Sequence, residues 1–249
     1  MSAPGASLLP AAADYGHTNL GWDATLGVLS GRPVGASSKQ AALVLEDLTL
    51  VVLEDGAERD SSRLAGSTME QALEWLGKSI ADDPAALALP QHEMPAHPLG
   101  AGGAFSDAAG PERAELAAWI ADATAALRET VSGEAGASAV RCWPHHFDIA
   151  SLISLDAGKD AEEARSIGVG FSPGDASYDQ PYFYVTPWPY PDGDALPPLA
   201  HGALWHREGW TGAVLSGERV ISERADRQSR AVQQMLGEAI TVCRTMLGD

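Results

Sequence analysis

The stretch that decides the fold reads RCWPHHFDIA at 141–150, SIGVGFSPGD at 166–175 and PYFYVTPW at 181–188. Of the 16 Phe, Trp and Tyr residues in the chain, 11 lie between Trp143 and Trp210, together with four of the seven His. Rings gathered in this way predict either the main hydrophobic core or the wall of a ligand site. Both interpretations fit the sequence.

Apolar runs bounded by turn residues predict the strands. We expect strands at 25–29, 42–46, 49–53, 147–155, 166–171 and 182–186, and within 203–215. Pro173 and Gly174 follow one of these runs, and they occupy the positions that a type II turn requires of Pro and Gly. The second half of the chain is therefore predicted to be rich in strands.

Apolar residues at helical spacing predict helices at 67–81, 111–131 and 222–247. The first would begin with a capping box of Ser67 and Glu70. We expect a single α+β domain over 1–249, with mostly antiparallel sheet and the three helices packed on one side. Each half has strands followed by a helix, an order that would also fit two similar halves. The Pro/Ala/Gly-rich segment 82–110 is predicted to be a long loop, acting as a lid or a linker.

Composition narrows the classes of partner. The formal net charge is −18 and no basic block occurs, so the phosphates of nucleic acids and anionic membranes would be repelled. No apolar run approaches the roughly 18 residues of a membrane-spanning helix, and the first residues lack the basic start of a secretory signal. Cys142 and Cys243 are too few for a disulfide framework and are read as reduced thiols. We expect a cytoplasmic protein with a small-molecule ligand.

Four polar residues are the candidates for chemistry. His146 and Asp148 would share one side of a strand, where a carboxylate can orient an imidazole for proton transfer. Asp175, after the Pro-Gly turn, and His206 could join them. Such a group suits general acid–base chemistry or, if further ligands converge, a metal. A satisfied hydrogen-bonded pair explains the same residues without any activity.

Aromatic residues near these groups are the candidates for ligand contact. A surface on which a flat ligand or a sugar ring stacks could be formed by Tyr182, Phe183, Tyr184, Trp188, Trp205 and Trp210. A strand with aromatic core residues on one face and amphipathic tyrosines on the other accounts for them equally well.

The sequence matches two familiar motifs only in part. In HEMPAH at 92–97 the second His follows the first by five residues, and Pro95 breaks the helix that a zinc-protease motif needs, so we predict a polar loop. Gly168 and Gly170 are not followed by the remaining glycine and the helix of a dinucleotide site. No cofactor is identified by the sequence.

The segments FDIA at 147–150, GFSPGD at 170–175 and PYFYVTPWP at 181–189 resemble a bacterial family called domain of unknown function 5996. The likeness extends over about 75 residues. The family pattern has small or aromatic residues where this chain has His145 and His146, so the resemblance implies Asp148 and Asp175 as the site residues. It brings no activity with it.

The sequence leaves three hypotheses for function. The first is an enzyme that acts on a small polar molecule through a cleft of carboxylates and aromatic rings. The second is a non-catalytic module that binds a small molecule in the same cleft. The third is a structural or assembly protein without an active site.

Overall fold

The computed structural model describes residues 1–12, 14–83, 85–90, 96–144, 146–159, 163–191 and 196–249. The chain divides into two compact units, Met1–Ala121 with Arg141–His146 and Asp122–Val140 with Phe147–Asp249. Over the described residues it forms five α-helices and two antiparallel sheets, which confirms the predicted α+β fold. None of the helices described is both long and apolar enough to cross a membrane.

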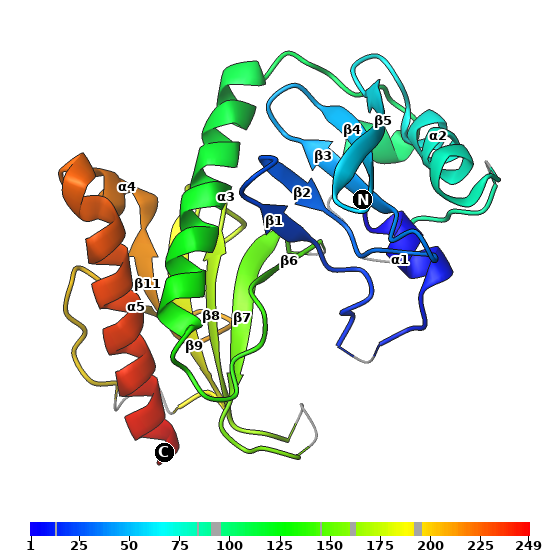
Figure 1. Ribbon diagram of the computed structural model, residues 1–249. Helices are drawn as coiled ribbons and strands as arrows, with labels where there is room; N and C mark the ends of the chain where they lie inside the picture. The colour runs from blue at the N-terminus through cyan, green and yellow to red at the C-terminus, as the bar shows by residue number, and fades with distance from the viewer. Residues whose placement is uncertain (13, 84, 91–95, 145, 160–162, 192–195) are drawn as a thin grey trace. The chain divides into compact units, whose positions relative to one another are not determined.

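The first unit is built on an antiparallel sheet in which each strand pairs with the next one along the chain (Figure 1). The strands are β1 (Gly21–Asp23), β2 (Val28–Ser30), β3 (Gln40–Val44), β4 (Thr49–Glu54) and β5 (Ala57–Arg63). β4 is buried on both faces, which explains its uninterrupted apolar run. Leu50 and Val52 pack in one cluster with Leu76 and Ile80 of α2 (Met69–Ala81), while Val51 and Leu53 pack in another on the opposite face. The first unit also contains helix α1 (Ala3–Leu8) and the short 3₁₀ helix η1 (Pro98–Ala101).

The N-terminus of α2 corrects one prediction. Thr68, and not Ser67, is the capping residue: its hydroxyl accepts a hydrogen bond from the Gln71 amide at 3.3 Å. The Gln71 side chain in turn accepts from the Thr68 amide at 2.9 Å. The predicted capping box of Ser67 and Glu70 is therefore wrong by one residue, because the Ser67 hydroxyl donates instead to the carbonyl of Leu64.

The second unit contains a sheet in the order β7-β8-β9-β11-β10, with all neighbours antiparallel. Its strands are β7 (Asp148–Ser154), β8 (Ser166–Ser172), β9 (Tyr182–Trp188), β10 (Leu204–His206) and β11 (Gly212–Ser216). The predicted segment 203–215 is two strands, because the chain turns at Arg207–Thr211 between β10 and β11. β1, β5 and the short β6 (Arg141–Trp143) were not predicted.

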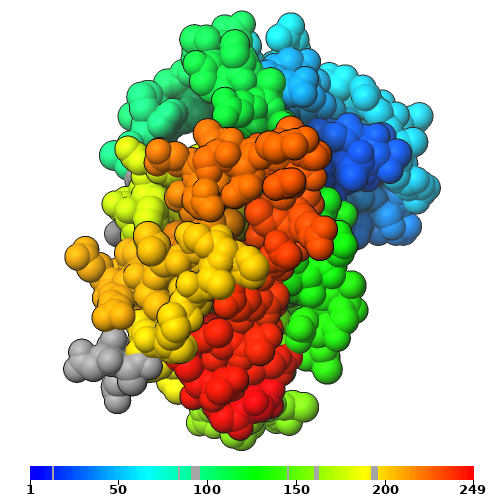
Figure 2. Space-filling model, turned by 90° about the vertical axis from the view of Figure 1, so that its left-hand side faces the viewer, coloured from blue at the N-terminus to red at the C-terminus, as the bar shows by residue number. Residues whose placement is uncertain are grey.

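Helix α5 (Ala225–Leu247) runs along one face of this sheet and contacts β8, β9 and β11 (Figure 1). Its buried side chains recur at helical spacing: Val232, Met235, Leu236, Ala239, Ile240 and Cys243. Figure 2 shows the outer surface of α5 beside the segment before β10, where His201 lies 3.7 Å from Glu238. The predicted helix 222–247 begins at Ala225, after a separate short helix α4 (Gly217–Ile221). Helix α3 (Gly110–Val131) agrees with the predicted 111–131 and contains the boundary between the units.

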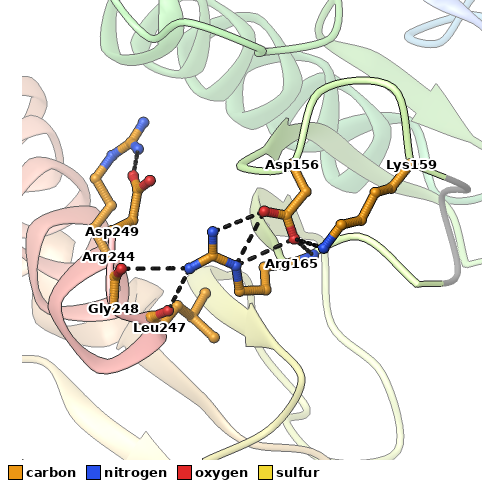
Figure 3. A network of polar contacts seen from close by, with 7 residues as sticks. All are labelled: Asp156, Lys159, Arg165, Arg244, Leu247, Gly248 and Asp249. Carbon is orange, nitrogen blue, oxygen red and sulfur yellow. Dashed lines mark hydrogen bonds and ion pairs between the residues drawn. The ribbon is translucent and has the colours of Figure 1, made fainter.

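Arg165 binds the C-terminal end of α5 through hydrogen bonds (Figure 3). Arg165 Nη1 donates to the Leu247 carbonyl at 2.7 Å, and Nη2 donates to Asp156 Oδ1 at 2.7 Å. Lys159 Nζ lies 3.1 Å from the other oxygen of the same carboxylate. A cation suits the carbonyl end of a helix because the helix dipole is negative there. Hydrogen bonds from Arg165 hold the pKa of the Asp156 carboxyl well below its usual range.

Candidate tyrosine–carboxylate site

The side chains of β9 alternate between the two faces of the second sheet. Phe183 lies in the core, where its ring centroid is 5.1 Å from that of Phe171. Tyr182 and Tyr184 lie on the opposite face. Tyr184 is directly opposite Gly170 of β8, and a Cβ atom at Gly170 would lie 2.4 Å from the tyrosine ring. Glycine at this position is therefore what allows Tyr184 to lie across the sheet.

Each of these tyrosines donates a hydrogen bond to a carboxylate. The Tyr184 hydroxyl lies 2.5 Å from Oδ2 of Asp148, the first residue of β7. The Tyr182 hydroxyl lies 2.5 Å from Oδ2 of Asp175. The other oxygen of Asp175 accepts from the backbone amides of Ser177 at 2.8 Å and Tyr178 at 3.1 Å, which closes an Asx turn. Asp175 thus orders the loop that follows β8.

A stack of rings continues from Tyr182. The Tyr178 ring lies 4.8 Å from that of Tyr182, and its hydroxyl is 3.1 Å from Nδ1 of His206. His206 Nε2 lies 2.8 Å from the Glu208 carbonyl oxygen, which can only accept, so Nε2 is the donor of that hydrogen bond. His206 also stacks on Trp210 at 4.3 Å between centroids.

We call this group the tyrosine–carboxylate network; it consists of Asp148, Asp175, Tyr178, Tyr182, Tyr184, His206 and Trp210. Trp210 closes it, with centroid distances of 6.5 Å to Tyr182 and 6.2 Å to Tyr184. Tyr178, Tyr184, His206 and Trp210 are half-buried, Tyr182 is buried and Asp175 is exposed. The network is therefore a polar aromatic surface that solvent reaches at several points.

The phenols of the network stay protonated at neutral pH. Burial of its hydroxyl, and then the charge and hydrogen bond of Asp148, raise the pKa of Tyr184 well above its ordinary value. Burial and the hydrogen bond to Asp175 likewise raise the pKa of Tyr182. Burial raises the pKa of Tyr178, with a smaller contribution from Asp175. These tyrosines can donate hydrogen bonds, but they are poor sources of phenolate for nucleophilic or basic chemistry.

The network brings together Asp148, Asp175 and His206 from the candidates for chemistry, and Tyr182, Tyr184 and Trp210 from the candidates for ligand contact. Phe183 is in the core. Trp205 is also on the core-facing side of its strand, and its indole nitrogen donates to the Pro197 carbonyl at 2.7 Å. Trp188 lies at the end of β9, where its side chain is 45% exposed and contacts Tyr190 edge-on.

The sequence suggested that His146 and Asp148 share one face of a strand. The structure does not place them in this way. β7 begins at Asp148, and Phe147 has a φ of 56°, so the extended alternation does not reach back to His146. His146 is exposed and belongs to the first unit, whereas Asp148 belongs to the second. The pairing of these two residues on one strand is therefore wrong. His92 lies outside the described residues, and so does His145.

Sequence reasoning did not select Tyr178 as a site residue. It named Tyr182 and Trp210 only as candidates for a stacking surface and did not connect them with Asp175 or His206. No spacing rule could have placed Tyr178 or Trp210, since loops bring them to the network. Among the described residues, no three of His, Cys, Asp and Glu are arranged to hold a metal ion.

Comparison with family models, curated proteins and solved structures gives no match. The resemblance to domain of unknown function 5996 therefore stays a prediction.

Proposed function

We propose that the second unit is a non-catalytic binding module, and that its tyrosine–carboxylate network binds a small polar molecule. One observation carries this proposal: among the described residues, the donors to Asp175 are neutral, being a tyrosine hydroxyl and two backbone amides. Neutral donors orient a carboxylate but leave its negative charge in place. The charge then remains available to a ligand.

The chemistry of the network favours a ligand that carries a cationic amine. Aromatic rings attract cations through their faces, and an adjacent carboxylate adds a charge-assisted hydrogen bond. Tyr178 and Tyr182 provide rings beside Asp175, within an otherwise acidic chain of net charge −18. Lys and Arg are absent from the residues that define the network.

Binding fits better than catalysis because the polar groups already hold one another. Both nitrogens of His206 are engaged, so the imidazole has no nitrogen ready to take a proton from a substrate. Both oxygens of Asp175 are engaged as well. A network of this kind keeps its donors and acceptors in fixed positions, as recognition requires.

The test is a calorimetric titration of the full chain with ethanolamine. The same titration with glycerol serves as the neutral comparison. We expect ethanolamine to bind and glycerol to bind far more weakly. Asp175→Asn should weaken ethanolamine binding by about tenfold or more, the usual effect of losing a charged partner. Asp156→Asn is the matched control, since it removes one carboxylate from the same unit outside the network. Equal weakening by both variants, or no binding to the wild type, would overturn the proposal.

Catalysis on a small polar molecule is the second candidate, and the Asp148–Tyr184 pair favours it. Asp148 is half-buried, and its charge also raises the pKa of Tyr182, so two phenols and one carboxylate lie close together. If Asp148 transfers a proton, Asp148→Asn should keep the thermal stability of the chain and lose turnover of the bound amine. A large loss of stability instead would mark Asp148 as structural.

A further inference from the structure

The first unit has a pocket of about 250 Å³ whose walls carry two arginines. Ser30 and Gln40 contribute polar side chains to the lining, and the remaining lining residues are Gly21, Gly31 and Pro33. Among the described residues, no carboxylate belongs to this lining, although acids outnumber Lys and Arg in the chain by 34 to 16. None of the predicted site residues lines it.

Backbone pairing places Arg141 beside the residues that line the pocket. Leu20 and Cys142 are bridged by two backbone hydrogen bonds of 2.9 Å, which sets Arg141 beside Gly21. Gly21 pairs in turn with Ser30, the last residue of β2, and Arg32 follows two residues after that strand ends. Both arginines line the same pocket.

Gly21 gives Arg141 the room to lie across the sheet. A Cβ atom at Gly21 would be 2.8 Å from Nη1 of Arg141, which is closer than such atoms normally approach. The Gln40 amide donates to the Gly31 carbonyl at 2.9 Å, and the Ser30 hydroxyl donates to the Gly21 carbonyl at 3.4 Å. These bonds hold the side chains of Gln40 and Ser30 in place in the lining of the pocket.

Arg32 supplies the second observation. Within the part of the chain that the structure describes, its guanidinium makes no hydrogen bond and no ion pair, although the residue is half-buried. A guanidinium has five N–H donors, and a partly buried one without an acceptor is in a poor environment. An anion in the pocket would satisfy it.

We propose that this pocket binds a phosphate-class oxyanion, either free or as the phosphate group of a small phosphorylated molecule. The planar fork of Arg32 matches a tetrahedral oxyanion through paired hydrogen bonds, and the positive charge of Arg141 in the same lining adds attraction. A volume of 250 Å³ is smaller than most drug-sized pockets and suits a single anionic group. This inference is independent of the proposed amine-binding function, because it rests on other residues in the other unit.

Calorimetric titration of the full chain tests it, with inorganic phosphate in one arm and glycerol 1-phosphate in the other, both at constant ionic strength. We expect saturable binding of at least one probe, and the tighter probe identifies the free ion or the ester as the ligand. Arg32→Ala should weaken that binding by about tenfold or more. Arg63→Ala is the matched control, since Arg63 is an exposed arginine of the same unit outside the pocket.

Gly21→Ala is the second variant, because it keeps every charge and only displaces Arg141. It should also weaken binding, and a circular dichroism spectrum matching the wild type would show that the fold is retained. Equal weakening by Arg32→Ala and Arg63→Ala would mean diffuse charge attraction and would overturn the proposal. Absence of saturable binding to both probes would overturn it as well.

Discussion

Two carboxylates of the second unit are held by hydrogen bonds from partners of different charge. Asp156 is held by the guanidinium of Arg165 and the ammonium of Lys159. Asp175 is held by a tyrosine hydroxyl and two backbone amides. The cations neutralise Asp156 and join it to the end of α5, so its role is structural. The neutral donors of Asp175 do not cancel its charge, and aromatic rings lie beside it, which is the arrangement that a cationic ligand could use.

The largest expected effect comes from Gly170→Ala, which disrupts the network and leaves the Arg165 cluster intact. The added Cβ would lie 2.4 Å from the ring of Tyr184, so the ring must move away from Asp148. Overpacking of this kind costs about 1–3 kcal/mol, and we expect that loss in urea denaturation. The matched control is Gly237→Ala in α5, where the new Cβ contacts nothing within 4 Å and should be neutral or stabilising. An unchanged denaturation midpoint for Gly170→Ala would contradict the close approach of Tyr184.

The sequence predicted the sheet better than the site for a physical reason. Period-two alternation and turn residues specify strands locally, and β7, β8 and β9 were found within two residues at each end. The edge strand β5 was missed because its seven residues AERDSSR are polar and almost fully exposed, so they carry no apolar alternation. Strand prediction from apolar runs fails where a strand has no buried face.

Several candidate residues that the structure brings into the network are fixed by a strand or by a tight turn. Asp148 and Tyr184 are on strands, and Asp175 is in the turn that Pro173 and Gly174 predict. Tyr178 and Trp210 reach the network from loops, where the backbone path depends on contacts between distant segments. The prediction for His146 failed at one backbone angle, the positive φ of Phe147, which no local propensity requires.

Acid titration should separate the two carboxylates by their partners. Because the folded state holds the pKa of Asp156 below its unfolded value near 3.9, the unfolded chain binds more protons as the solution is acidified. The stabilisation from Asp156 is therefore present above roughly pH 4 and is lost as the pH falls further. We expect Asp156→Asn to be less stable than the wild type at pH 6, and to lose less stability between pH 5 and pH 3. Parallel midpoint curves for the two proteins over this range would contradict the ion pair.

Alkaline titration tests the network, because folding raises the pKa of Tyr184 instead of lowering it. The folded state raises the pKa of Tyr184 above its unfolded value near 10, so the unfolded chain loses its proton first as the pH rises. The stability linked to this proton is complete below roughly pH 10 and declines above it. Tyr184→Phe removes the group, and we expect a smaller drop in denaturation midpoint between pH 8 and pH 10.5 than in the wild type.

A second variant assigns the cause of that shift. Asp148→Asn keeps an acceptor for the Tyr184 hydroxyl but removes the charge that raises its pKa. Phenolate absorbance should then appear at lower pH in the variant than in the wild type. An unchanged titration curve would show that burial alone sets the pKa of Tyr184, and that Asp148 contributes no charge to the network.

The smallest effect is expected from Lys159→Ala, which tests whether charge or geometry makes the Asp156 cluster structural. Lys159 and Arg165 both contact Asp156, but the Lys159 side chain is 57% exposed and forms a single contact three residues along the chain. Exposed pairs of this kind contribute little because water screens them and the long side chain must be held still. Arg165 instead bridges Asp156 and the Leu247 carbonyl through one rigid fork (Figure 3). We therefore expect Lys159→Ala to leave the melting temperature unchanged within error, and Arg165→Ala to lower it. Equal losses would mean that positive charge near Asp156 suffices, and that the link to the end of α5 contributes nothing of its own.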